Sequence, residues 1–216
     1  QKSLPSLNNT LLKYLEAKES PLDSIVLWNN YTDSISQHFD QKTLHFISSS
    51  SIDIGNQKIN GNVIIESNKS ISVATNSNLD NIVLIAPFIS IADGFNGILQ
   101  LQARDSVTIG ESVSLNYPSS IVLYDTKSVK DSTGYIKIGN SSRITGELLA
   151  IQKEYNYRDK ISIQCAPKST ITGNVYVNGI ASLKDITING SIYCQQINVK
   201  TGGSNHNNTL LDVMLS

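Results

Sequence analysis

Short strands in which apolar and polar residues alternate recur along the chain from Ser51 to about residue 200. This period of two places the outer members of each triplet on the same side of the strand. Most of these outer members are β-branched, as a half-buried strand prefers. The triplets are Ile52–Ile54, Val63–Ile65, Ile71–Val73, Val83–Ile85, Ile89–Ile91, Leu99–Leu101, Val107–Ile109, Ile121–Leu123, Ile136–Ile138, Ile161–Ile163, Val175–Val177, Ile186–Ile188 and Ile197–Val199.

The spacing of the strands indicates a repeating coil. Equivalent triplets begin at Ile52, Ile71, Ile89 and Val107, which are 19, 18 and 18 residues apart. A second series has the form apolar–Asn/Thr–Gly–x–apolar, and its first two glycines are 36 residues apart, or two coils of 18. Glycine at such a bend supplies a positive φ or allows close backbone approach. The glycines of this series are Gly61, Gly97, Gly146, Gly173 and Gly190.

These observations predict an all-β fold, a single-stranded right-handed parallel β-helix (β-solenoid) of about seven coils and roughly 35 Å in length. One coil of about 18 residues cannot bury its apolar side alone, whereas stacked coils bury a continuous core. A β-sandwich also has many short strands, but it does not predict one turn motif that recurs at coil length. A left-handed hexapeptide helix needs an apolar residue every six positions, which this chain lacks.

The two ends of the chain differ from the repeats. We expect residues 1–50 to form an N-terminal helix and strand capping region, residues 51–200 the β-helix, and residues 201–216 a C-terminal cap or tail. A short helix is predicted by the spacing of Leu7, Leu11, Leu12 and Leu15. A strand with the only tryptophan, Trp28, follows it. Solenoid ends expose unpaired backbone, so a cover is expected there.

Irregular spacing predicts insertions around 124–135 and 152–160, where tyrosines gather. Loop tyrosines are common anchors for sugars or protein partners, which makes these residues a candidate partner-binding surface. The alternative is that they pack over the flank of the solenoid and hold the insertions down. The five residues are Tyr117, Tyr124, Tyr135, Tyr155 and Tyr157.

Composition narrows the classes of partner. The net charge of −1, with only 16% charged residues, argues against a nucleic-acid partner or an anionic bilayer. No run approaches the roughly 18 apolar residues of a membrane span, so membrane contact is expected only through a segment absent from this sequence. We expect an extracytoplasmic location, in the periplasm or at the cell surface, anchored if at all by a segment before Gln1; a cytoplasmic location is the alternative.

Catalytic and metal-binding patterns are absent from the sequence. Four carboxylates, Asp93, Asp105, Glu111 and Asp125, stand singly, although a lyase or a glycoside hydrolase needs them grouped. The histidines His38, His45 and His206 lie outside any metal-binding motif. We therefore expect no enzyme activity, no metal and no cofactor.

The two cysteines continue the alternation of their strands. Cys165 follows Ile161 and Ile163, and Cys194 follows Ile192, so both thiols should point inward. Buried free thiols are favoured, with a disulfide between neighbouring coils as the alternative.

The glycine-containing repeats resemble those of bactofilins, bacterial proteins that form polymers from short β-helical rods stacked end to end. The similarity lies in Ile144–Ala150, Ile171–Gly179 and Ile188–Tyr193, and it extends more loosely over residues 51–110. The resemblance implies a structural, self-associating role without catalytic residues. The N-terminal fifth and the irregular spacing have no counterpart in a bare bactofilin rod.

The function expected from these observations is that of a non-catalytic structural or scaffold protein of the bacterial cell envelope. Its partners would be copies of itself, joined end to end or laterally, or envelope proteins and glycans. The alternatives are an extracellular adhesion module that binds glycan or protein and, less favoured, a carbohydrate-active lyase or hydrolase.

Overall fold

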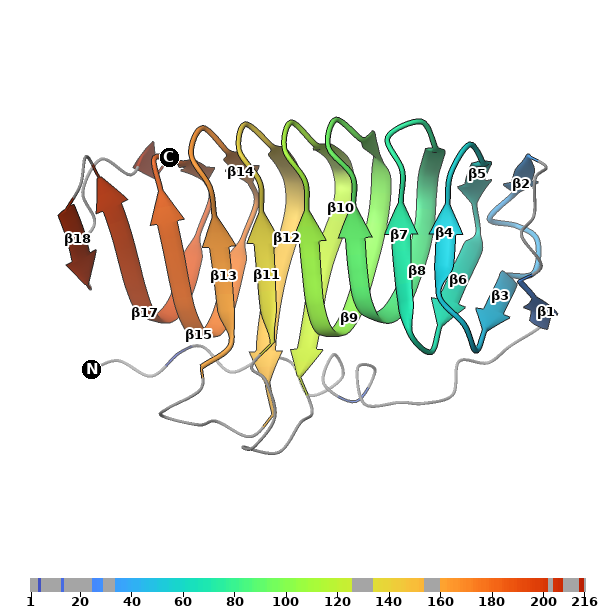
Figure 1. Ribbon diagram of the computed structural model, residues 1–216, viewed down its shortest axis with the longest axis horizontal. Helices are drawn as coiled ribbons and strands as arrows, with labels where there is room; N and C mark the ends of the chain where they lie inside the picture. Colours follow the sequence, from blue (N-terminus) through green and yellow to red (C-terminus); the bar gives the residue numbers. More distant parts are fainter. Residues whose placement is uncertain are drawn as a thin grey trace.

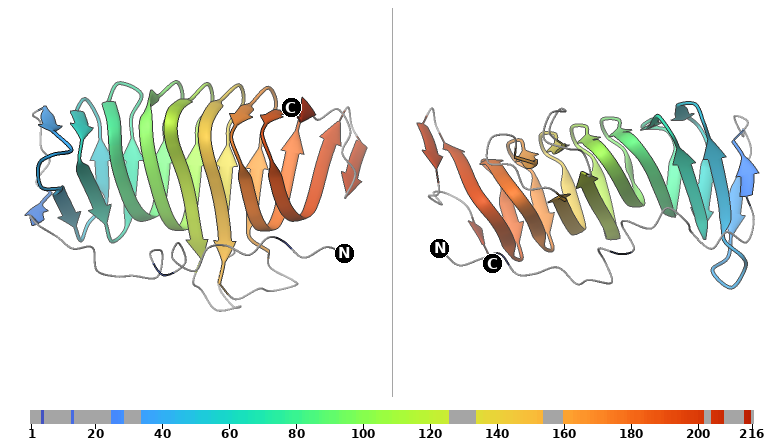
Figure 2. Two further views of the ribbon diagram at one scale, coloured as in Figure 1. Left: turned by 180° about the vertical axis from the view of Figure 1, so that it is seen from behind. Right: turned by 90° about the horizontal axis from the view of Figure 1, so that it is seen from below.

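The protein is all-β, and its strands are stacked along one long axis in the computed structural model (Figure 1). The structure describes residues 4, 13, 25–28, 34–125, 134–153, 160–201, 204–207 and 214–215. Two further views show the same stack from behind and from below (Figure 2). All strand pairs in the described residues are parallel except that of β17 with β18.

The strands are mostly short, but some bend around a corner and so serve two sides of the stack. They are β1 (Ile25–Leu27), β2 (Ile35–Gln37), β3 (Leu44–Ser48), β4 (Ile52–Ile54), β5 (Lys58–Gly61), β6 (Val63–Ser67), β7 (Ser70–Val73), β8 (Asn78–Ile91), β9 (Asn96–Ile109), β10 (Ser114–Asp125), β11 (Tyr135–Ile138), β12 (Arg143–Gln152), β13 (Ser162–Cys165), β14 (Thr170–Thr172), β15 (Val175–Lys184), β16 (Thr187–Asn189), β17 (Ile192–Thr201), β18 (Ser204–Asn207) and β19 (Met214–Leu215).

The pairings form three parallel ladders, which each turn of the chain visits in the same order. Ladder 1 holds β4, β7, the ends of β8 and β9, β11, β13, and the ends of β15 and β17. Ladder 2 begins with β2 and β5, and ladder 3 begins with β1, β3 and β6. Neighbouring strands of a ladder are about 4.8 Å apart, so the length of the stack follows from the number of turns.

The predicted repeat is confirmed by the register of ladder 1. Ile52 pairs with Ile71, Ile71 with Ile89, and Ile89 with Val107. The ladder continues through Ile136, Ile163, Ala181 and Ile197. The two longest steps, from Val107 to Ile136 and from Ile136 to Ile163, contain the two predicted insertions.

Inward side chains of the three ladders merge into one apolar core. On ladder 1, Ile52, Ile71, Ile89, Val107, Ile136 and Ile163 are all at most 2% exposed. Burying such a side chain fully contributes about 1.5–3 kcal/mol relative to leaving it in water. Because the core runs through every turn, each coil depends on its two neighbours for burial.

The stack begins earlier than the expected boundary at residue 51. Strands β1, β2 and β3 already pair in parallel with β3, β5 and β6. Trp28 is 9% exposed, and its ring lies 5.5 Å from that of Phe46 in an edge-to-face contact. These residues therefore belong to the first coils. The predicted helix around Leu7, Leu11, Leu12 and Leu15 lies outside the described residues.

At the other end, two short strands add to the last coil. β18 pairs antiparallel with the second half of β17, and β19 pairs with β16. Residues 198–200 and 187–188 therefore have a strand on both sides. This end cover falls within residues 201–216, where the sequence predicted a cap or a tail.

Four of the five repeat glycines stand at the bend between ladders 2 and 3. Gly61, Gly146, Gly173 and Gly190 have positive φ angles between 91° and 149°. At Gly173, an added Cβ atom would lie 1.9 Å from the carbonyl oxygen of Gly146 in the preceding coil. At Gly173 the bend therefore disfavours a residue with a side chain by both backbone conformation and space.

Gly97 does not belong to this series, so its assignment to the bend was wrong. It pairs with Leu115, which in turn pairs with Ile144, two residues before Gly146. The Phe95 ring approaches within 2.7 Å of where a Cβ of Gly97 would stand. The same Cβ would lie 2.4 Å from the Leu79 carbonyl oxygen of the preceding coil, so the glycine makes room for both the Phe95 ring and the neighbouring backbone.

Candidate binding groove

The predicted tyrosine surface is not a single surface in the described residues. Tyr117 is 75% exposed on β10, and Tyr135 is 38% exposed on ladder 1 beside Ser106 and Ser162. Tyr124 is only 4% exposed, so the prediction that it belongs to a partner-binding surface was wrong. Its burial agrees with the alternative, that tyrosines here pack over the flank. Tyr155 and Tyr157 lie outside the described residues.

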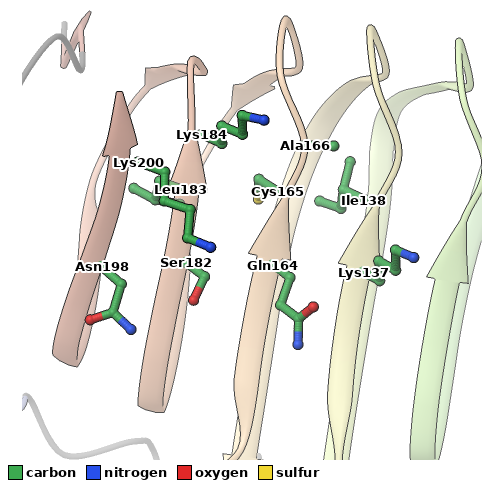
Figure 3. Close-up of a pocket in the computed structure, with 10 residues that line it drawn as sticks. All are labelled: Lys137, Ile138, Gln164, Cys165, Ala166, Ser182, Leu183, Lys184, Asn198 and Lys200. Atoms are coloured by element: carbon green, nitrogen blue, oxygen red, sulfur yellow. The ribbon is translucent and has the colours of Figure 1, made fainter. Parts of the chain in front are cut away.

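A different site lies on the outer side of ladder 1, near the C-terminal end of the stack. It is a shallow groove with a volume of about 400 Å³ that crosses β11, β13, β15 and β17 (Figure 3). Sequence reasoning did not find it. Its lining residues are Lys137, Ile138, Gln164, Cys165, Ala166, Ser182, Leu183, Lys184, Asn198 and Lys200.

One row of polar side chains crosses the groove. Lys137 pairs with Gln164, Gln164 with Ser182, and Ser182 with Asn198, so four successive strands each contribute one side chain. These residues alternate with buried neighbours such as Ile163, and the row therefore points outward (Figure 3). Amide and hydroxyl groups both donate and accept hydrogen bonds. The row offers this capacity at regular intervals.

The basic side chains of the groove are not neutralised by the protein. Lys184 and Lys200 pair in register on adjacent strands, and both are exposed, as is Lys137. Within the described residues, no ion pair involves any of these three lysines. Asp185 follows Lys184 at the next turn, but it is not part of the lining. Like charges directly opposite each other on a ladder are destabilising, so this pair favours the approach of an anion.

The cysteines are free thiols and stand on different ladders. Cys165 pairs with Leu183 on ladder 1, while Cys194 pairs with Val177 on ladder 3. Burial raises the pKa of the Cys165 thiol to about 12. Burial also raises the pKa of the Cys194 thiol. Cys165 therefore stays protonated near neutral pH and is a poor nucleophile, although it borders the groove.

The chemistry available in the groove is binding rather than proton transfer. Its lining holds three ammonium groups, two amides and one hydroxyl, with no carboxylate and no imidazole. In the described part of the chain, no group of three or more His, Cys, Asp or Glu residues could hold a metal ion. The groove can thus attract an anion and hydrogen-bond it, but it offers no acid–base pair matched to neutral pH.

Among the described residues, the one side-chain ion pair lies at the other end of the stack. His45 on β3 is 2% exposed, and its Nε2 lies 3.0 Å from Oε2 of Glu66 on β6. An ionised carboxylate can only accept, so Nε2–H is the donor, while Nδ1 is buried without a hydrogen-bond partner. The hydrogen bond from His45 lowers the pKa of Glu66 despite its partial burial.

Among the described residues, no helix is long and apolar enough to cross a membrane. Comparison with protein-family models, with curated proteins and with solved structures found no match to this chain. The resemblance to bactofilins therefore stays a prediction that rests on the residues of the repeats.

Proposed function

We propose that this chain is a right-handed parallel β-helix that serves as a non-catalytic structural scaffold of the bacterial cell envelope. The observation that carries the proposal is the unbroken register of ladder 1 from Ile52 to Ile197. Such a ladder makes a stiff rod, because every coil is hydrogen-bonded to the next.

The handedness follows from general stereochemistry. A connection between two parallel strands of one sheet is right-handed in about 98% of proteins, because strands twist to the right. Each turn of this chain is such a connection, since it leaves a ladder and returns to it one strand further along. A right-handed coil is thus the sense that agrees with the twist of the strands.

Self-association is supported by strand edges at both ends. Within the described residues, β1, β2 and β4 each pair on one side only. At the other end, the first half of β17 (Ile192–Cys194) pairs with β15 alone among the described strands, whereas β18 pairs with residues 198–201 and β19 with residues 187–188. An open strand edge is a template for pairing with another chain. The Ile192–Cys194 edge is therefore the proposed contact between copies.

The test is the mass and shape of the full chain in solution across a concentration series, by light scattering and negative-stain microscopy. The proposal predicts rods that lengthen with concentration. Tyr193→Lys, which places a charge on the Ile192–Cys194 edge, should keep the protein monomeric. Gln195→Lys adds the same charge at an exposed position just beyond the edge and should assemble as the wild type does. A wild-type protein that stays monomeric at high concentration would exclude self-association.

A second candidate function is supported by the groove. A glycan- or protein-binding module needs a concave surface with polar side chains that converge, and the outer side of ladder 1 offers one. The lining of the groove contains no acid–base pair, and this favours binding over lyase or hydrolase chemistry.

A further inference from the structure

We propose that the groove on ladder 1 binds an extended oligosaccharide that carries carboxylate groups. This inference does not depend on whether copies of the chain associate, because the groove lies on the side of the rod rather than at its end. It rests on the second candidate function, the glycan- or protein-binding module, and it names the chemical class of the ligand. Three features of the groove support it: the placement of charge, the uncharged polar side chains beside the charges, and the paired backbone beneath them.

Charge is placed at two separated points of the groove. Lys184 and Lys200 lie side by side on β15 and β17, whereas Lys137 lies on β11. From β11 the ladder advances two strands to β15 and three to β17, or roughly 10 and 14 Å at about 4.8 Å per strand. A ligand that neutralises both points must therefore be extended and carry separated negative charges. A single small anion could meet only one of them.

Beside these lysines the groove also carries polar, uncharged side chains, with Gln164 on β13 between Lys137 and the lysine pair. Gln164, Ser182 and Asn198 form the outward row, and each can donate to or accept from a hydroxyl group. Asn198 Oδ1 already accepts from the Gln196 amide, at 2.9 Å, which orients the Asn198 side chain. A row of this kind suits the ring hydroxyls of a sugar chain.

The backbone beneath the groove argues against an extended peptide as the ligand. Strands β13 and β15 pair on both sides, so they have no free edge to which a peptide strand could add. The lining contains no aromatic side chain on which a nucleic-acid base could stack.

The sequence does contain a signal for this site. Lys184 follows the inward Leu183 by one residue, and Lys200 follows the inward Val199 in the same way one coil later. Two outward lysines at equivalent positions of adjacent coils repel each other, and a bound anion would relieve that repulsion. Lys137 is harder to connect with them, since an insertion separates its coil from β13.

The experiment is a calorimetric titration of the full chain with hexamers of galacturonate and of alternating glucuronate and N-acetylglucosamine. We expect saturable binding of at least one of them, which weakens as the salt concentration rises. The carboxyl-reduced, neutral forms of both hexamers should not bind. Lys184→Gln with Lys200→Gln should weaken binding about tenfold, the sum expected for two exposed ion pairs.

Two matched double variants distinguish binding in the groove from nonspecific attraction of an anion to any exposed lysine. Lys42→Gln with Lys58→Gln removes two charges from exposed positions outside the groove and should leave the affinity unchanged. Lys184→Arg with Lys200→Arg keeps the charge and should retain binding. No saturable binding of either hexamer, or equal weakening by the two double Gln variants, would overturn the proposal. Equally tight binding of a hexaglutamate peptide would assign the groove to acidic peptides instead and would also overturn it.

Discussion

At the scale of single residues, the His45–Glu66 pair makes the start of ladder 3 sensitive to acid. Glu66 accepts a hydrogen bond from an imidazole that is almost fully buried, and this bond lowers the pKa of Glu66 below its ordinary value of 4.5. The folded state therefore binds the proton of Glu66 less readily than the unfolded state does. Stability from this group is fully present above pH 4.5 and is lost as the pH falls through the lowered pKa.

The lowered pKa of Glu66 predicts how the free energy of unfolding changes with pH. Between about pH 5 and pH 3, the wild type should lose more stability than Glu66→Gln, because the variant has no proton to take up at this position. Denaturant unfolding at several pH values measures the difference. Asp40→Asn, at an exposed carboxylate outside the pair, is the control and should follow the wild type. Parallel curves for wild type and Glu66→Gln would show that the pair does not link folding to pH.

At the scale of elements, the bend between ladders 2 and 3 is the most restrictive part of the coil. Gly173 has a φ of 140°, and a methyl group there would meet the Gly146 carbonyl of the preceding coil. We expect Gly173→Ala to cost about 2–4 kcal/mol, from backbone strain together with the displaced neighbour.

Gly55→Ala provides the matched control. The nearest atom to a Cβ at this turn is the Gln57 amide oxygen, at 3.8 Å, and the φ of Gly55 is not in the left-handed region. This substitution should change the free energy of unfolding by less than about 0.5 kcal/mol. Equal losses in the two variants, measured by denaturant unfolding, would mean that the stacked bend does not limit the fold.

The elements also show how far the sequence could predict the structure. The triplets at Ile52, Ile71, Ile89 and Val107 pair as their spacing predicted. In coils of nearly constant length, residues that pair are separated in the sequence by the length of one coil. Gly97 misled the alignment because the local motif around it resembles the bend. The strand register and the backbone conformation distinguish the two, and both depend on three-dimensional placement.

The groove could not be predicted in full for a related reason. Its row depends on the register of four strands, and the step from Ile136 to Ile163 is 27 residues long because of an insertion. A bulge between Val177 and Ile180 then shortens the last step to 16 residues. Outward polar residues have no apolar periodicity of their own, so irregular steps hide which of them become neighbours.

At the scale of the whole molecule, the stack is quasi-one-dimensional, and its stability should vary along the rod. β9 in the middle has neighbours on both sides, since it pairs with β8, β10 and β11. β1 and β4 at one end pair on one side only within the described residues. Because each coil contacts only adjacent coils, opening can begin at an end without disturbing the centre.

Hydrogen exchange of backbone amides should therefore show a gradient along the rod rather than a single rate. We expect slow exchange in the paired residues of β8, β9 and β10, and faster exchange in β1, β2 and β18. The number of coils over which the exchange rate changes reports how many coils open together. If copies associate through the Ile192–Cys194 edge, protection of β17 should rise with protein concentration while that of β9 does not change. Uniform exchange from β1 to β18 would instead show that the stack opens as one cooperative unit and that its ends are as stable as its centre.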